Sequence, residues 1–233
     1  MDNTTRNYRV CRTILMSKGW LTDQPEAFAS AMLRDMTVSR YEAGEIVYRQ
    51  GDVADGLYGI ASGQILHYAT TPNGDDLVLF TGVAGEWFGE RAAMRNMVRP
   101  STAVALTDSL VARVSERNLL NIFSRNPAYF RCIADLATRH LERWISFATE
   151  ILSQSGRVRL LRILGMLADD LTAPDDSAET VIHITQSHLA SLARLSRQST
   201  NIILREFERD GFIELRYRAI IITDRYRLML DTD

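Results

Sequence analysis

The sequence has few of the features that mark several large classes of protein. Its two cysteines, Cys11 and Cys132, form no CxxC or metal-type cluster, so neither a disulfide nor an iron–sulfur cluster is expected. No apolar run approaches the ~20 residues that span a bilayer, and the first residues lack a secretory hydrophobic segment. A cytoplasmic protein without membrane contact is therefore expected.

A strong net charge and a catalytic signature are missing as well. The formal net charge is −2, which gives no reason to expect that the whole surface binds nucleic acid. The chain contains no Ser/His/Asp grouping, no glycine-rich nucleotide motif and no metal-ligand spacing. These absences predict a protein that is not an enzyme and that holds neither a metal nor a cofactor.

Residues 184–213 predict two short helices joined by a tight turn. Thr185 and Ser196 are good N-caps for the two helices, and Gly211 ends the second. Apolar residues repeat at helical spacing along both helices. They are Leu189, Leu192 and Ala193 in the first, then Ile203, Leu204 and Phe207 in the second.

The second of these helices offers polar side chains that suit the major groove of DNA. Arginine pairs bidentately with guanine, glutamine and asparagine pair with adenine, and serine reaches phosphate. The candidate contacts are Arg197, Gln198, Ser199 and Asn201. An ordinary helical hairpin with a solvated polar face is the competing interpretation.

The residues after this helix favour DNA. Residues 212–217 and 219–223 predict two strands around a tight turn that carries Arg216 and Arg218. Between Arg194 and Arg227, eight arginines and five acids give a local charge of +3. Helix, turn, helix and basic hairpin together predict a winged helix-turn-helix whose hairpin lies along the phosphate backbone.

The amino-terminal part of the chain predicts an antiparallel roll. Short strands with evenly spaced turns between them are typical of such a fold, and a lead-in helix is expected over residues 22–37. The expected strands are 45–49, 56–60, 64–70, 76–83, 101–105 and 110–114. Residues 89–102 interrupt the pattern with a Gly-Glu opening and a short helical segment, an arrangement that can hold a phosphate.

A long helix is predicted from Asn126-Pro127 to about Ser153, with two apolar stripes. The first has the alternating four-three spacing of a seam for a partner helix, which predicts a homodimer. It contains Ile133, Ala137, His140, Trp144, Phe147 and Ile151. The second stripe, which could face the roll, contains Leu141, Ile145, Ala148 and Leu152.

These elements divide the chain into three parts in an α+β fold. Residues 1–125 are expected to form the roll, residues 126–155 the dimerisation helix and hinge, and residues 156–233 the winged helix-turn-helix.

The order of elements and several motifs resemble the CRP/FNR family of bacterial transcription regulators over roughly residues 20–230. The motifs are Gly51-Asp52, Leu57-Tyr58-x-Ile60-x-x-Gly63-x-Ile65, Phe88-Gly89-Glu90, and Arg197 in the second helix. The resemblance implies a cyclic-nucleotide-binding-like roll, a dimerisation helix and a winged helix-turn-helix. It also implies that a signal received by the roll and long helix re-aims the recognition helices.

The resemblance places Arg197, Gln198 and Ser199 where the family contacts bases and phosphates. Thr185, Gln186 and Ser187 match the phosphate-contacting start of the preceding helix. Ile202 stands where a relative has a polar reader. Its side chain either contacts a thymine methyl group or makes no base-specific contact at this position.

In the roll, the resemblance carries over only in part. Gly89 and Glu90 match the family's ribose-binding pair, and Ser101 matches its phosphate-binding serine. Pro100 stands in the place of the phosphate-binding arginine, with Arg99 one residue early. Trp144-Ile145 replaces the pair that holds adenine. The expected effector site therefore comprises Gly89, Glu90, Arg99, Ser101 and Trp144, and its ligand is not cyclic AMP: either another small molecule binds there or none does.

The implied function is sequence-specific regulation of transcription by a homodimer on double-stranded DNA, with RNA polymerase as a further partner. Activation and repression both remain open. The alternative is a small-molecule or haem sensor that signals through protein partners, in which His67 and His140 could meet as haem ligands.

Overall fold

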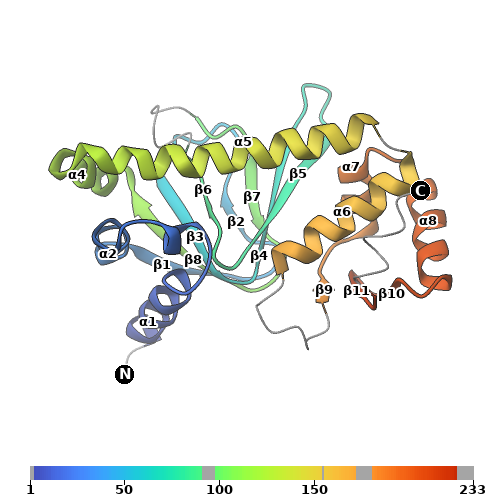
Figure 1. Ribbon diagram of the computed structural model, residues 1–233, viewed down its shortest axis with the longest axis horizontal. Helices are drawn as coiled ribbons and strands as arrows, with labels where there is room; N and C mark the ends of the chain where they lie inside the picture. Colours follow the sequence, from blue (N-terminus) through green and yellow to red (C-terminus); the bar gives the residue numbers. More distant parts are fainter. Residues whose placement is uncertain (1–2, 91–97, 154, 172–179, 225–233) are drawn as a thin grey trace. The chain divides into compact units, whose positions relative to one another are not determined.

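The computed structural model describes residues 3–90, 98–153, 155–171 and 180–224 (Figure 1). The chain forms two compact units. The first comprises Met1–Asp76 and Thr81–Glu142, and the second comprises Leu77–Phe80 and Arg143–Asp233. None of the helices in these described segments combines the length and the apolar character that crossing a membrane requires.

Two four-stranded antiparallel sheets form the predicted roll. Gly63 permits the turn between two of the strands, since its φ is +84° and a Cβ there would lie 2.2 Å from Ser109 Oγ. One sheet has the order β1 (Thr37–Tyr41), β8 (Ser109–Ser115), β3 (Gly56–Ser62), β6 (Trp87–Phe88). The other has the order β2 (Ile46–Tyr48), β7 (Thr102–Ala105), β4 (Gln64–Thr70), β5 (Asp76–Val83).

The helices before the roll differ from the prediction. A helix α1 (Asn3–Leu15) that was not expected lies beside β3 and β1. The predicted lead-in helix over 22–37 is too long: the 3-10 turn η1 (Trp20–Asp23) and helix α2 (Glu26–Arg34) replace it. The β-branched pair Thr37 and Val38 instead begins β1, because it pairs with β8.

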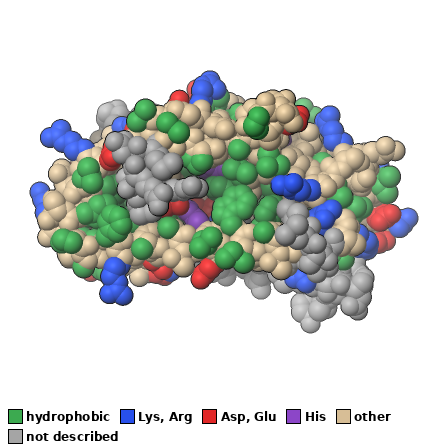
Figure 2. Space-filling model, turned by 90° about the horizontal axis from the view of Figure 1, so that it is seen from above, with side chains coloured by type: hydrophobic (Ala, Val, Ile, Leu, Met, Phe, Trp, Pro, Cys, Tyr) green, Lys and Arg blue, Asp and Glu red, His purple; other side chains and the backbone are tan. Residues whose placement is uncertain are grey.

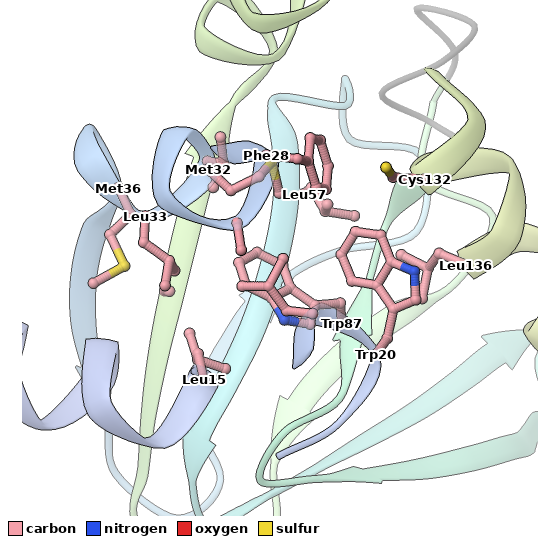
Figure 3. Packing of buried hydrophobic residues seen from close by; sticks show 14 of the residues in the cluster. Leu15, Trp20, Phe28, Met32, Leu33, Met36, Leu57, Trp87, Cys132 and Leu136 are labelled. Carbon is pink, nitrogen blue, oxygen red and sulfur yellow. The ribbon is translucent and has the colours of Figure 1, made fainter. Parts of the chain in front are cut away.

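A hydrophobic core joins these helices to one sheet of the roll (Figure 3). The ring of Trp20 lies edge-on to those of Phe28 and Trp87, with centroids 5.9 and 6.0 Å apart. Leu57 from β3 and Leu136 from the long helix complete this part of the cluster. Burial of this apolar area is what holds the amino-terminal helices onto the roll.

Helix α4 (Glu116–Arg125) and the turn η2 (Pro127–Tyr129) lead into α5 (Phe130–Ser153), the predicted long helix. Its two apolar stripes agree with the prediction only in part, since Trp144 of the predicted seam is exposed. Ile133, assigned to the dimer seam, is 2% exposed in the core, so that assignment is wrong. Leu141 and Ile145, expected to face the roll, are each 58% exposed. The side chain of Ile151 lies outside the described residues.

Figure 2, which views the molecule from the side of α5, shows hydrophobic side chains at that surface. The exposed apolar positions of the helix follow heptad spacing. They are Phe130, Ala134, Leu141, Trp144, Ile145 and Ala148. We call this set the α5 stripe.

The second unit contains the predicted winged helix-turn-helix. Its sheet has the order β10-β11-β9, and β9 is a strand that was not predicted. The elements are α6 (Gly156–Leu171), β9 (Thr180–Ile182), α7 (Gln186–Ala193), α8 (Arg197–Arg209), β10 (Ile213–Arg216) and β11 (Ala219–Ile222).

The position of Ile133 predicts a large effect of truncation. Ile133→Ala should lower the free energy of unfolding by about 2–5 kcal/mol, because the substitution leaves a cavity in the core. Leu120→Ala removes a similar volume from an exposed side chain on α4. It should change the free energy of unfolding by less than about 1 kcal/mol. Urea unfolding measures both; equal effects would contradict the placement of Ile133.

Candidate functional site

Side-chain caps fix the two helices of the helix-turn-helix, as the sequence predicts. Thr185 Oγ1 accepts from the backbone N–H of His188 at 3.1 Å, and Ser196 Oγ accepts from that of Ser199 at 3.0 Å. Arg194 ends α7 with a left-handed φ of 50°, which turns the chain sharply toward α8. The start of α8 is therefore held by local interactions.

The front of α8 presents the predicted polar side chains unevenly. Arg197 and Gln198 are exposed, whereas Ser199 is half-buried and shares a 2.8 Å hydrogen bond with Ser196 Oγ. Asn201 is half-buried, and its Oδ1 is enclosed without a hydrogen-bond partner in the described residues. Arg197 and Gln198 are therefore the side chains of this group that are best placed to meet a base.

An exposed stripe continues along α8 beyond these residues. Its members recur at helical spacing, while the opposite face of the helix is buried through Leu204 and Phe207. Ile202 is 55% exposed, so its side chain is open to a contact outside the protein. The stripe consists of Gln198, Ile202, Arg205 and Arg209. On α7, Gln186 is exposed, and Thr185 and Ser187 are half-buried.

The basic hairpin is attached to α8. The backbone N–H of Leu215 donates to Glu208 Oε1 at 3.0 Å. Arg216, a predicted phosphate contact, donates two hydrogen bonds to the carboxylate of Glu214, with nitrogen–oxygen distances of 2.8 and 3.3 Å. The Arg216 guanidinium is thus held by a neighbouring acid in a solvent-exposed ion pair, whereas Arg218 is exposed without such a partner among the described residues.

In the first unit, Arg99 lies buried in the roll with 1% of its area exposed. Its Nη2 donates to Asp55 Oδ1 at 2.8 Å and to the carbonyl of Gly56 at 2.9 Å. Its guanidinium carbon lies 4.3 Å from the ring centre of Tyr48 and 5.1 Å from that of Tyr58. The cation is therefore enclosed by protein groups.

Asp55 is the centre of this cluster. Burial raises the pKa of Asp55, but hydrogen bonds from Tyr58, Arg99 and Arg113 outweigh burial and leave the pKa lowered. The carboxylate is thus charged at neutral pH and faces two guanidinium groups. Sequence reasoning missed Asp55, Tyr48 and Tyr58, because no local pattern links them to Arg99.

The other predicted effector residues lie in two places. Gly89 has a φ of +91°, and a Cβ there would lie 2.5 Å from Arg99 Nη1. Glu90 is buried, and its Oε1 lies 2.9 Å from His140 Nδ1 on α5. Ser101 is also buried. Trp144 belongs to the second unit, where its ring lies edge-on to those of Phe80 and Phe147.

The predicted helical segment after Glu90 covers residues 91–97, which lie outside the described residues. His67, the other candidate haem ligand, is 1% exposed, and its ring packs 4.7 Å from that of Phe88. Burial lowers the pKa of His67 to about 3, with smaller contributions from the charges of His140 and Arg99. The ring is therefore neutral in the folded protein at physiological pH.

Comparisons with known proteins agree with both parts of this architecture. Residues 38–126 match the cyclic nucleotide-binding domain, and residues 158–230 match the Crp-like helix-turn-helix domain. The chain is 25% identical over 206 residues to the CRP-like cAMP-activated global transcriptional regulator of Mycobacterium tuberculosis, covering 88% of this chain and 92% of that protein. It is also 25% identical over 187 residues to the transcriptional regulator LdrP of Thermus thermophilus, covering 80% of this chain and 92% of that one.

Solved structures show the same fold. The c-di-GMP responsive global regulator CLP of Xanthomonas campestris superposes with a TM-score of 0.70 at 22% identity. The match covers 86% of this chain and 100% of that one. At this identity, the likeness concerns the fold alone.

The buried neutral state of His67 predicts a pH dependence of stability. As the pH falls below about 6.5, the unfolded chain takes up a proton at this residue, whereas the folded chain does so only near its pKa of about 3. Relative to His67→Gln, the wild type should lose about 1.4 kcal/mol of unfolding free energy per pH unit between pH 6 and 4.5. Urea unfolding across this range measures the difference.

His183→Gln is the matched control, since His183 is exposed. Its pH profile should follow that of the wild type. Parallel profiles for wild type and His67→Gln would show that His67 is not held neutral by burial.

Proposed function

The chain belongs to the CRP/FNR family of transcription regulators, and from this premise we propose that it acts as a homodimer on an inverted-repeat DNA operator. The observation that carries the DNA contact is the exposed polar front of α8, held in place by the Ser196 cap. Such a helix fits the major groove, where arginine and glutamine distinguish guanine from adenine. Family membership alone supports RNA polymerase as a further partner.

We assign the main base contact to Arg197, with Gln198 beside it. Both side chains are exposed at the first turn of α8, the part of a recognition helix that meets base edges. The exposed Ile202 lies one turn further on and offers an apolar contact for a thymine methyl. Gln186 supplies a contact to phosphate, which positions the protein without reading sequence.

Loss of Arg197 should weaken specific binding far more than non-specific binding. For a duplex enriched by the wild type from a random library, Arg197→Ala should lose about 1–3 kcal/mol, roughly 5- to 150-fold in affinity, because a bidentate base pair contact is lost. Fluorescence anisotropy at fixed salt measures this, with a scrambled duplex for comparison. Arg117→Ala, which removes an exposed arginine from α4, is the control for charge.

Equal affinity of wild type and Arg197→Ala for the enriched duplex would remove Arg197 from the interface. Failure of the wild type to enrich any sequence would contradict the proposed function itself.

We propose that the dimer forms through the α5 stripe. Its apolar side chains are exposed in the single chain, which is unfavourable in water, and its heptad spacing matches what a second α5 needs for knobs-into-holes packing. Two chains paired in this way present two copies of α8. The operator should then be an inverted repeat with half-sites about 34 Å apart.

A charge in this stripe should produce monomers. Ile145→Asp places a carboxylate in the proposed apolar interface, where an unpaired charge is costly, and should give monomers at micromolar concentration. Ser146→Asp places the same charge on an exposed position about a third of a turn away and should leave a dimer. Sedimentation velocity distinguishes the two states; a dimeric Ile145→Asp would place the interface elsewhere.

We further propose that the effector is not a cyclic nucleotide. A cyclic nucleotide brings a phosphate that needs a cation, but the charge of the buried Arg99 guanidinium is already paired with Asp55, and its Nη2 also donates to a backbone carbonyl. Glu90, the family's ribose contact, is engaged with His140. In the places of the family's adenine-binding pair, Trp144 carries a single indole N–H donor and Ile145 carries no polar side-chain group. Either a ligand without a phosphate binds or the protein binds DNA without an effector.

A further inference from the structure

The tip of the β10–β11 hairpin has an unusual composition for its geometry. Arg216 and Ala219 pair across the strands, which leaves Tyr217 and Arg218 as the two turn residues. Arg218 has a φ of +56°, in the left-handed region that favours glycine or asparagine. Tyr217 is 92% exposed, the largest exposure among the large hydrophobic residues described. Both residues are unfavourable choices for a turn that only has to join two strands.

Neither side chain is explained by contacts within the protein. The tyrosine ring has almost no neighbour at this exposure, and Arg218 forms no ion pair with the described residues. The neighbouring Arg216 is different, because it is held by Glu214. The tip thus presents one uncommitted aromatic ring and one uncommitted cation side by side. Strain of this kind is typical of positions that serve a binding partner.

The hairpin is held at a fixed place relative to α8. The hydrogen bond from the Leu215 N–H to Glu208 Oε1 joins β10 to the helix, and the rings of Phe207 and Phe212 lie 6.1 Å apart at the junction. Residues Ile213 and Ile220 bury the inner face of the hairpin. When α8 occupies a major groove, a hairpin attached in this way meets the DNA beside that groove.

We propose that Tyr217 and Arg218 form a second DNA-reading element that enters the minor groove flanking each half-site. The inference rests on the proposed DNA binding and adds a site to it. The tyrosine ring packs against deoxyribose, and the guanidinium lies in the groove, where the negative potential is greatest over narrow A·T-rich sequence. The element therefore selects A·T pairs outside the segment that α8 reads.

The test begins with duplexes enriched by the wild type from a random library. These should show A·T preference at flanking positions, and replacing those pairs by G·C should weaken wild-type binding about fivefold. Tyr217→Ala should bind the enriched duplex about tenfold more weakly and lose the flanking preference. Tyr217→Phe, which keeps the ring, should retain both.

Arg218→Gly separates a binding role from a structural one. Glycine relieves the left-handed strain, so the variant should melt at a higher temperature than the wild type. It should nevertheless bind the enriched duplex more weakly. Arg117→Ala on α4 controls for the loss of one exposed positive charge and should change neither quantity appreciably.

Wild-type affinity and flanking preference in Tyr217→Ala would overturn the inference. If Arg197→Ala still bound poorly in the same assay, the proposed function would stand without it. If the two tip residues only connect the strands, Arg218→Gly should be more stable than the wild type and bind DNA with the same affinity. That result would also overturn the inference.

Discussion

The buried guanidinium of Arg99 needs a counter-ion, and Asp55 supplies it from within the same unit. An uncompensated charge in a protein interior is very unfavourable, so the surrounding roll is arranged around this pair. Tyr48 and Tyr58 cover the cation, Gly89 leaves room for it, and Arg113 holds the other oxygen of Asp55. The charge of an arginine that a ligand phosphate would otherwise neutralise is already neutralised by Asp55, which is why we propose an effector other than a cyclic nucleotide.

The DNA-binding unit depends on shorter-range interactions. The hydroxyl caps of Thr185 and Ser196 and the left-handed Arg194 set the angle between α7 and α8, and buried Leu204 and Phe207 fix which face of α8 is outside. These interactions are sufficient to place the polar residues at the start of α8 on the exposed side of the helix. The hairpin, joined to α8 through Glu208, adds a second exposed surface at Tyr217 and Arg218, which we propose contacts DNA.

The distance along the chain between interacting residues explains which features could be predicted from the sequence. The helix-turn-helix was predictable because caps and helical periodicity act over a few residues, and the roll because turns punctuate its strands. Both stripes of α5 are apolar at similar spacing, so the pattern could not tell which positions are buried: Ile133 is buried, whereas Trp144 of the same stripe is exposed. Asp55 was missed because its pairing with Arg99 joins residues 44 apart in the chain.

The central claim is that the roll neutralises its own arginine and therefore does not respond to cyclic nucleotides. Isothermal titration calorimetry of the whole protein with cyclic AMP and cyclic GMP tests this most directly. We expect no saturable heat at micromolar concentration for either nucleotide. A micromolar dissociation constant that Arg99→Ala abolishes would contradict the account, since it would show that the guanidinium leaves Asp55 to bind a phosphate.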